Sequence, residues 1–258
     1  MKLEQVIEVN KYPINDADFQ QKCKAILDRD GALVLPNFLS EIALKQAIEE
    51  GKAKQNLAYY SKEGHNVYLK PSDADFPVEH PRNRQVSSSK GCITDDQIGD
   101  SSPLRTLYNS TDFRAFLATV LGEEKLYNYT DPLSSINLHY ASEGQELGWH
   151  FDESSFATTL LLQSPEGGGV FEYIENMRDA DIGEMNYDGV AEVLDGKRQS
   201  KVLEASASTL VMFRGRNAMH RVTPTQGDIT RMLVVLAYNS QPDVTLSESA
   251  RMTFYGRV

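Results

Sequence analysis

The sequence predicts a mainly β fold of the sandwich or jelly-roll type, with helices on its flank. Two observations carry this prediction. From about residue 134 onward, short apolar runs alternate with turns rich in Gly, Pro and Asp, a pattern typical of such folds. Before that point, apolar residues recur mainly at helical spacing. The predicted strands are 134–141, 157–163, 169–174, 201–205, 208–214, 218–223, 231–238 and 250–255.

The helical flank is predicted from apolar periodicity and from residues that begin or end helices. A first helix is expected over 14–29, a second over 41–55 and a third over 112–121. Ser40 is well placed to cap the second helix, because its hydroxyl can accept from a free backbone N–H. The apolar run 31–36 between the first two helices predicts one further strand.

In two segments the apolar residues show no clear periodicity. Residues 56–103 are polar and turn-rich, which favours a lid or binding loop. Residues 176–200 are expected to form an exposed insertion between strands. We expect one domain over 1–258, with residues 1–130 as helical flank and lid and residues 131–258 as the β core.

Composition narrows the class of protein. The 258 residues carry a net charge of −11, which disfavours nucleic acid and anionic membranes as partners. Cys23 and Cys92 lie far apart, so we expect free thiols in a reducing compartment. The N-terminus lacks the apolar core of a signal peptide, and no apolar run approaches the roughly 18 residues of a membrane span. A cytoplasmic protein with a small-molecule partner is expected; the oligomeric state is left open.

Three residues form a candidate metal-binding set. His150 and Asp152 are two apart, so on a strand their side chains leave the same face. His220 follows seventy residues later, in an apolar run that ends in a turn. Two imidazoles and one carboxylate are the ligands of non-haem iron(II) sites with open coordination positions. Zinc accepts the same three ligands.

Arg231 suggests an anionic ligand beside the metal. It opens an apolar strand, where a buried arginine is unfavourable without an anionic partner. We expect a hairpin centred between Thr225 and Gln226, which would place Arg231 opposite His220 with Cβ atoms roughly 5 Å apart. Such an arginine could bind the far carboxylate of a metal-chelating dicarboxylate. A structural salt bridge is the alternative.

Together these residues resemble a known family. The order His150-x-Asp152, His220, Arg231, with the glycine-rich segment 160–172, resembles the Fe(II)/2-oxoglutarate-dependent dioxygenases. Residues 148–152 and 252–257 are similar to a subgroup that hydroxylates or halogenates free amino acids without a carrier protein. The resemblance implies a double-stranded β-helix, a cupin-like jelly roll.

The resemblance also implies a reaction and its cofactors. It assigns His150, Asp152 and His220 as Fe(II) ligands, and as the catalytic centre, and Arg231 as the anchor of 2-oxoglutarate. Dioxygen is the other co-substrate, and succinate and CO2 are products. Halogenating members of the subgroup have Gly or Ala in place of the carboxylate, which leaves room for chloride. Asp152 therefore favours hydroxylation of a small polar substrate, with a free amino acid expected.

Further residues are candidates for binding roles. Asn137 and Tyr140, on the strand before the metal set, are predicted to contact the cofactor, although neighbouring residues of a strand face opposite ways. A core role for Tyr140 is at least as plausible. Four residues are candidates for contacts with the substrate: Arg82 for a carboxylate, Asp131 and Glu153 for an ammonium, and Trp149 as a pocket wall. Ordinary surface or core roles are the alternatives for all four.

Other functions compatible with the sequence are a halogenase, a cupin-like metal-dependent hydrolase or isomerase, and a binding module. Asp152 argues against the first of these. Arg231 argues against the others, because none of them needs a 2-oxoglutarate anchor. An inactive jelly roll used for interactions is disfavoured by the complete ligand set.

Overall fold

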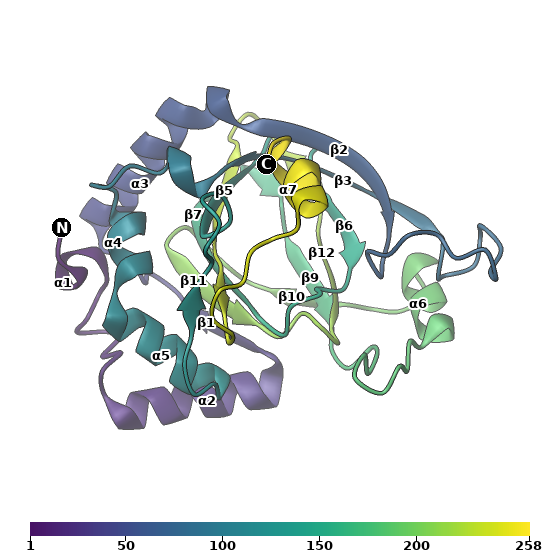
Figure 1. The fold of residues 1–258 in the computed structure, drawn as a ribbon, viewed down its shortest axis with the longest axis horizontal. Helices are drawn as coiled ribbons and strands as arrows, with labels where there is room; N and C mark the ends of the chain where they lie inside the picture. Colours follow the sequence, from purple (N-terminus) through teal and green to yellow (C-terminus); the bar gives the residue numbers. More distant parts are fainter.

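The computed structural model describes all 258 residues and has a curled antiparallel sheet at its centre (Figure 1). Eleven strands form this sheet. Ten follow the order β1-β11-β7-β14-β5-β3-β6-β12-β9-β10, and β2 pairs with the free side of β3. The sheet bends where β3 meets β6, at the pairing of Ser88 with Leu147. This bend makes two facing layers, the arrangement of a jelly roll, and the predicted fold class is confirmed.

One layer contains β1 (Ala32–Leu35), β11 (Thr209–Phe213), β7 (Ala157–Gln163), β14 (Arg231–Leu236), β5 (Ile136–Ala141) and β3 (Gln85–Ile93), with β2 (Tyr59–Asn66) beside β3. The other contains β6 (Leu147–His150), β12 (Met219–Val222), β9 (Phe171–Ile174) and β10 (Lys201–Leu203). Two small pairs lie apart from them: β8 (Gly167–Gly168) with β13 (Thr225–Gln226), and β4 (Tyr127–Asn128) with β15 (Tyr238–Asn239).

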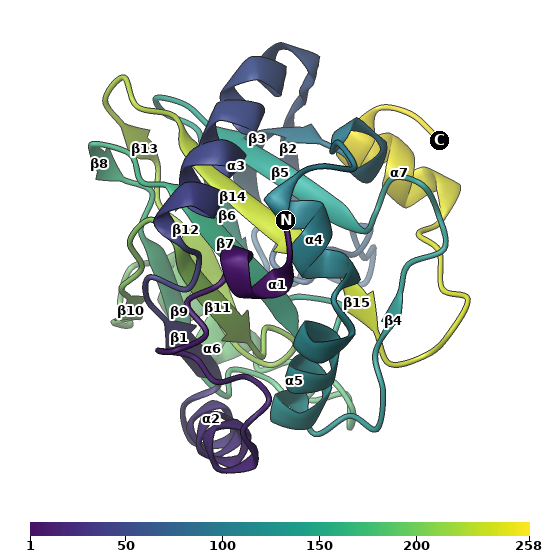
Figure 2. The same ribbon diagram turned by 90° about the vertical axis from the view of Figure 1, so that its left-hand side faces the viewer.

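Helices cover the outer face of the first layer (Figure 2). They are α1 (Leu3–Val6), α2 (Ala17–Asp30), α3 (Glu41–Lys54), α4 (Pro103–Asn109) and α5 (Thr111–Leu121). The largest apolar cluster lies between these helices and β5, β7, β11 and β14. Its formation explains why alternate residues of those strands are apolar, and it leaves the opposite strand faces to line the inside of the barrel. No helix has the length and apolar character needed to cross a membrane.

Much of the predicted secondary structure matches the observed elements. The helices expected over 14–29, 41–55 and 112–121 correspond to α2, α3 and α5. Ser40 does cap α3, since its Oγ accepts from the backbone N–H of Ala43. Seven of the predicted strands have counterparts in β5, β7, β9, β10, β11, β12 and β14, and run 31–36 contains β1.

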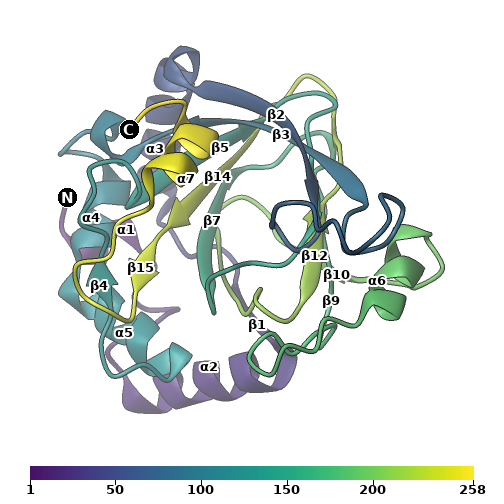
Figure 3. The same ribbon diagram turned by 45° about the vertical axis from the view of Figure 1, so that its right-hand side comes forward.

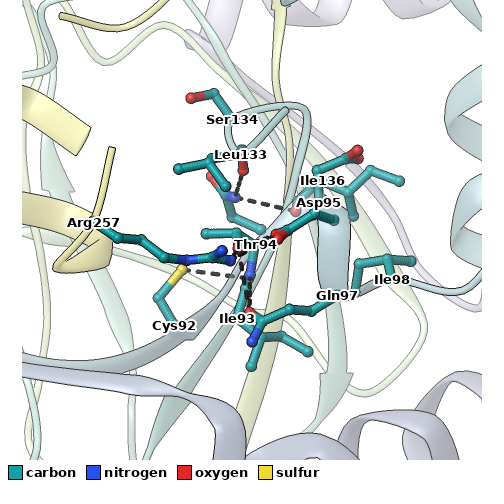
Figure 4. Close-up of polar contacts among 12 residues, drawn as sticks. Cys92, Ile93, Thr94, Asp95, Gln97, Ile98, Leu133, Ser134, Ile136 and Arg257 are labelled. Atoms are coloured by element: carbon teal, nitrogen blue, oxygen red, sulfur yellow. Dashed lines mark hydrogen bonds and ion pairs between the residues drawn. The ribbon is translucent and has the colours of Figure 1, made fainter. Parts of the chain in front are cut away.

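The predicted strand 250–255 is wrong, because this segment is the helix α7 (Glu248–Tyr255). Ser247 caps its start by accepting from Ala250 N, and Gly256 ends it in the left-handed conformation. Arg257 then reaches the end of β3 and donates to Thr94 Oγ1 at 2.6 Å (Figure 4). These contacts hold α7 beside β2 and β3, at one edge of the barrel (Figure 3).

The segment 56–103, expected to be a loop-rich lid or binding loop, contains more regular structure than the sequence predicts. Most of the segment is the β2–β3 hairpin, paired from Tyr59 with Cys92 to Asn66 with Gln85, and only residues 67–84 form its long connection. Polar residues fill both strands because β2 lies at the edge of the sheet and faces solvent. Without alternating apolar residues, the segment gave no strand signal.

The expected insertion 176–200 lies between β9 and β10, and part of it is helical. It contains α6 (Tyr187–Leu194), whose Val190 and Val193 pack with Trp149 and Phe151 in a second apolar cluster. The segment therefore covers the outer face of β6 instead of extending into solvent.

The predicted hairpin between His220 and Arg231 is not formed. β12 pairs with β6 and β9, whereas β14 pairs with β5 and β7 in the other layer. The residue opposite His220 is His150 on one side and Tyr173 on the other, and the residue opposite Arg231 is Ala141. The chain between them forms β13, which pairs with β8 and carries β14 across to the facing layer.

Candidate metal centre and cosubstrate site

His150, Asp152 and His220 converge inside the barrel. The pairing of His150 with His220 between β6 and β12 brings the imidazole centroids to 4.1 Å, with the rings tilted at 53° to each other. Asp152 follows the end of β6, and its Oδ1 lies 3.7 Å from His150 Nε2 and 3.5 Å from His220 Nε2. One donor atom from each of the three residues lies within 4.8 Å of the other two. The structure thus brings together the three residues that the sequence singled out.

Hydrogen bonds fix which ring nitrogens face the centre. His150 Nδ1 lies 2.8 Å from Gly148 O, and His220 Nδ1 lies 2.9 Å from Ala218 O. A carbonyl only accepts, so each Nδ1 carries the proton and each Nε2 offers a free lone pair toward Asp152. Backbone carbonyls that hold the distal ring nitrogen in this way are typical of histidine metal ligands.

The environment favours the protonation states that a metal needs. Burial, aided by the neighbouring His220, lowers the pKa of His150 to about 3, so the ring is neutral. Burial acts to raise the pKa of Asp152, but the two histidines and Lys90 outweigh it and lower the pKa to about 2. Two neutral imidazoles and one carboxylate are a donor set that fits iron(II).

Packing holds the metal-binding residues in place. The His220 ring lies between Phe171, stacked at 5.5 Å, and Phe213, edge-on at 5.0 Å. Arg178 covers the ring of Phe151 at 4.3 Å and donates from Nη2 to the backbone oxygen of Asp152. Neighbours of this kind reduce the freedom of the ligands and so favour a preformed site.

Gly215 leaves the space that the Asp152 carboxylate occupies. A Cβ added at Gly215 would lie 1.9 Å from Asp152 Oδ2 and 3.0 Å from His220 Cε1. Gly215→Ala is therefore expected to displace the carboxylate and lower iron affinity by about 10- to 100-fold. Calorimetric titration with Fe(II) under argon measures this change. Gly99→Ala, where no atom lies within 4 Å, is the matched control. Equal iron affinity in both variants would contradict the steric argument.

Arg231 enters the same interior from β14. Its register with β5 places it on the barrel side, on the same face as Leu233 opposite His139. The residue is half-buried, its shielded Nε has no hydrogen-bond partner, and desolvation alone lowers its pKa to about 10. No acidic side chain of this protein forms an ion pair with it. An unpaired buried guanidinium that lines an interior is suited to an external carboxylate.

The two other predicted cofactor contacts lie on opposite strand faces, as their spacing requires. Asn137 points into the barrel, where Nδ2 donates to Leu133 O and Oδ1 accepts from Tyr255. Tyr140 points outward into the helix-covered core and donates to Gly51 O at 2.7 Å. A cofactor contact from Tyr140 would need a route through the sheet, so its position corresponds to the core alternative.

Two of the predicted substrate residues contact the connection between β2 and β3, Arg82 half-buried and Glu153 exposed. Arg82 donates to Pro71 O at 3.1 Å and lies 4.0 Å from Asp73, within the connection between β2 and β3. Glu153 is exposed and pairs with Lys70 of the same connection. Both residues therefore stabilise this loop. A contact of either residue with a substrate stays a prediction.

The other two are buried among backbone and side-chain partners. Asp131 accepts from the backbone N–H groups of Leu133, Ser134 and Leu246, and thus fixes the approach to α7. Trp149 faces away from the barrel interior, under Arg221, whose guanidinium lies 4.8 Å from the ring. It borders a cavity of about 550 Å³ on the outer side of β6, β9 and β12.

Sequence reasoning missed two residues close to the metal set, His65 and Lys90. His65, on β2, lies edge-on to His150 at 6.3 Å and is bonded to Ser88 Oγ, which accepts from Gly148 N. Lys90 and His139 lie on β3 and β5, with Nζ and Nδ1 3.5 Å apart. The sequence could not point to Lys90, because β3 lacks the apolar alternation of a strand. Without that pattern, the face of the strand on which Lys90 lies could not be predicted.

Several solved structures share this architecture. SnoN, a non-haem α-ketoglutarate-dependent epimerase from nogalamycin biosynthesis, matches with a TM-score of 0.60 and 14% identity over 86% of this chain and 81% of its own. The carbocyclase SnoK matches with 0.58 and 12% over 92% of both chains. A 2OG-Fe(II) oxygenase family oxidoreductase from Burkholderia pseudomallei matches with 0.52 and 14%, over 86% and 91%.

The fold is that of these Fe(II)/2-oxoglutarate-dependent oxygenases, and the His-Asp-His set supplies donors that iron(II) accepts, in agreement with the enzyme class and the cofactors predicted from the sequence. Residues 15–254 match the family model HalD, Halogenase D, and the chain belongs to that family. No curated protein sequence matches this chain significantly. The family match agrees with the predicted subgroup of hydroxylases and halogenases.

Proposed function

We propose that this enzyme hydroxylates a free α-amino acid with a polar side chain, in the cytoplasm. His150, Asp152 and His220 would hold the iron, and Arg231 would anchor the far carboxylate of 2-oxoglutarate. Bound iron(II) and 2-oxoglutarate supply the activation of dioxygen, with succinate and CO2 released. The two cysteines are free and buried, as in a reducing compartment.

The chain's own residues position the reactants. His150 and His220 present lone pairs from two paired strands, with their tautomers fixed by Gly148 and Ala218. Arg231 approaches from the facing layer, so a chelating dicarboxylate would span the space between layers. Water is excluded on the His220 side by Phe171 and Phe213, which contact the ring.

Asp152 is the observation that favours hydroxylation. Its carboxylate lies within 3.7 Å of both Nε2 atoms, so it is placed to take the position that the resemblance leaves open in halogenating members. Gly215 provides the space for it. Halogenation is the second candidate, because the matching family model is described as a halogenase.

Product masses distinguish the two reactions. We expect succinate release to be stimulated by at least one free amino acid, with a product heavier by about 16 Da, the mass of one oxygen atom that such oxygenases insert. No chlorine is expected in the product, even at high chloride concentration. A chlorinated product from the unmodified enzyme would replace hydroxylation by halogenation. Failure of every free amino acid to stimulate succinate release would exclude the proposed substrate class.

A further inference from the structure

Lys90 is a second cation without an acidic partner inside the barrel. It is partly buried on β3, and no ion pair of the protein includes it. Its one side-chain polar contact is the 3.5 Å approach of Nζ to His139 Nδ1. Burial lowers the pKa of Lys90, as expected for an ammonium that has lost water without gaining a counter-ion.

His139 is not that counter-ion. Burial, followed by the charges of Lys90 and Arg231, holds its pKa well below the usual range, so the ring is neutral. A neutral Nδ1 accepts from Lys90 and orients the ammonium, but it supplies no negative charge. Buried charges without partners are unfavourable, which indicates that a ligand completes this site.

The sheet register places Lys90 level with Arg231. On β5, Ala141 pairs with Arg231 of β14, and Tyr140 pairs with Gly91 of β3. Lys90, one residue before Gly91, therefore lies level with Ala141 on the other side of β5. Two strand spacings separate the two cations, or roughly 10 Å at the backbone. Ala141, between them, has only a methyl side chain.

The charge balance leaves one negative charge to be supplied. Iron(II) with Asp152 carries +1, and 2-oxoglutarate carries −2. Arg231 and Lys90 then bring the total to +1, so Lys90 still lacks an anionic partner once 2-oxoglutarate is bound, and a further carboxylate would supply it. The Asp152 charge already acts on Lys90 and does not remove this excess.

The wall beside Lys90 is aromatic. Its Nζ lies 5.9 Å from the ring of Phe254 on α7, within reach of a cation–π contact. Asp131 and Arg257 hold this helix against β3, through Leu246 and Thr94. The helix therefore brings an apolar ring to the ammonium, at the barrel edge seen in Figure 3.

We propose that Lys90, oriented by His139, binds a carboxylate of the prime substrate, while Arg231 binds that of 2-oxoglutarate. This inference rests on the proposed function and assigns the α-carboxylate of the amino acid to Lys90 instead of Arg82. Arg82 already engages Pro71 and Asp73 in its own loop, whereas Lys90 has no such partners.

Calorimetry on protein loaded with Mn(II) and 2-oxoglutarate tests this without turnover. The probes are the proteinogenic amino acids, their carboxamides and propionate. The variants are Lys90→Met, which removes the charge at similar volume, and Lys90→Arg, which keeps it. Lys62→Met is the matched control on the neighbouring strand, where Lys62 is exposed and pairs with Ser89.

For a lost charged hydrogen bond, Lys90→Met is expected to weaken amino-acid binding by about 10- to 150-fold. Lys90→Arg and Lys62→Met should retain most of the affinity. The carboxamide should bind weakly to the wild-type protein. Its affinity for Lys90→Met should be no lower than its affinity for wild type. The affinity for 2-oxoglutarate should stay within about twofold, because a tenfold change would correspond to a lost interaction of about 1.4 kcal/mol.

Three results would overturn the assignment. A loss of 2-oxoglutarate affinity of about tenfold or more in Lys90→Met would give Lys90 to the cosubstrate. Equal binding of acid and carboxamide to wild type would remove the carboxylate contact. Binding of neither amino acids nor propionate would leave Lys90 without a ligand.

A different result would reject the proposed function and leave the carboxylate site at Lys90 standing. Propionate binding that depends on Lys90, with no amino acid bound, would support the carboxylate site and reject the amino-acid substrate. The visible absorption of the Fe(II)–2-oxoglutarate chelate, measured anaerobically in Lys90→Met, tests the metal and cosubstrate site independently.

Discussion

Replacing His220 with alanine is expected to abolish iron binding and turnover. His220 supplies one of only two imidazole lone pairs, and its Nε2 lies 3.5 Å from the carboxylate of Asp152. No other histidine can substitute from β12, and the aromatic neighbours Phe171 and Phe213 offer no donor. Iron content after anaerobic reconstitution, together with succinate release, measures the effect.

His80→Ala is the matched control for this loss. His80 stacks on Phe76 at 4.3 Å and contacts Tyr187, in the loop between β2 and β3. Its removal should leave the iron content unchanged, and circular dichroism should show that both variants keep the fold. Near-normal turnover in His220→Ala would refute the ligand set.

Arg231→Ala is expected to weaken 2-oxoglutarate binding by about 30- to 150-fold, which corresponds to about 2–3 kcal/mol for a lost charged hydrogen bond. The reason is the isolation of Arg231, whose shielded Nε has no hydrogen-bond partner and which forms no ion pair with an acidic side chain. Titration of the Fe(II)–2-oxoglutarate absorption band under argon measures the affinity.

Arg221→Ala separates this effect from a general loss of positive charge. Arg221 lies on β12 but on the outer face, paired with Glu172 at 2.7 Å and stacked on Trp149. We expect its removal to leave 2-oxoglutarate affinity unchanged. If Arg231→Ala also bound 2-oxoglutarate normally, the cosubstrate anchor would lie elsewhere, and Lys90 would be the first residue to examine.

The sequence predicted the chemistry of the centre better than its geometry. The residue types and order of His150, Asp152 and His220 sufficed to single out a set that converges in the structure, because donor chemistry depends on residue identity. The hairpin that was to join His220 and Arg231 is absent, because β12 and β14 belong to facing layers. Pairing across a barrel depends on contacts far apart in the chain, which local periodicity does not contain.

The missed elements have local explanations. Strands β2 and β3 are rich in Ser, Lys and Glu, since one of them is a solvent-facing edge, so neither shows the alternation of a half-buried strand. The prediction of a strand over 250–255 overlooked the residues that begin and end helix α7. Ser247 is its N-cap, Glu248 is an acidic residue in its first turn, and Gly256 ends it. Those three residues could have given the correct prediction.

The position of Trp149 provides an optical reporter. It is the only tryptophan in the chain, directly precedes His150, and lies almost fully shielded beneath Arg221. Selective excitation of indole fluorescence would therefore report on a single residue adjoining the metal set. Iron loading should quench this emission, and Arg221→Ala should shift it to longer wavelength by admitting water to the ring.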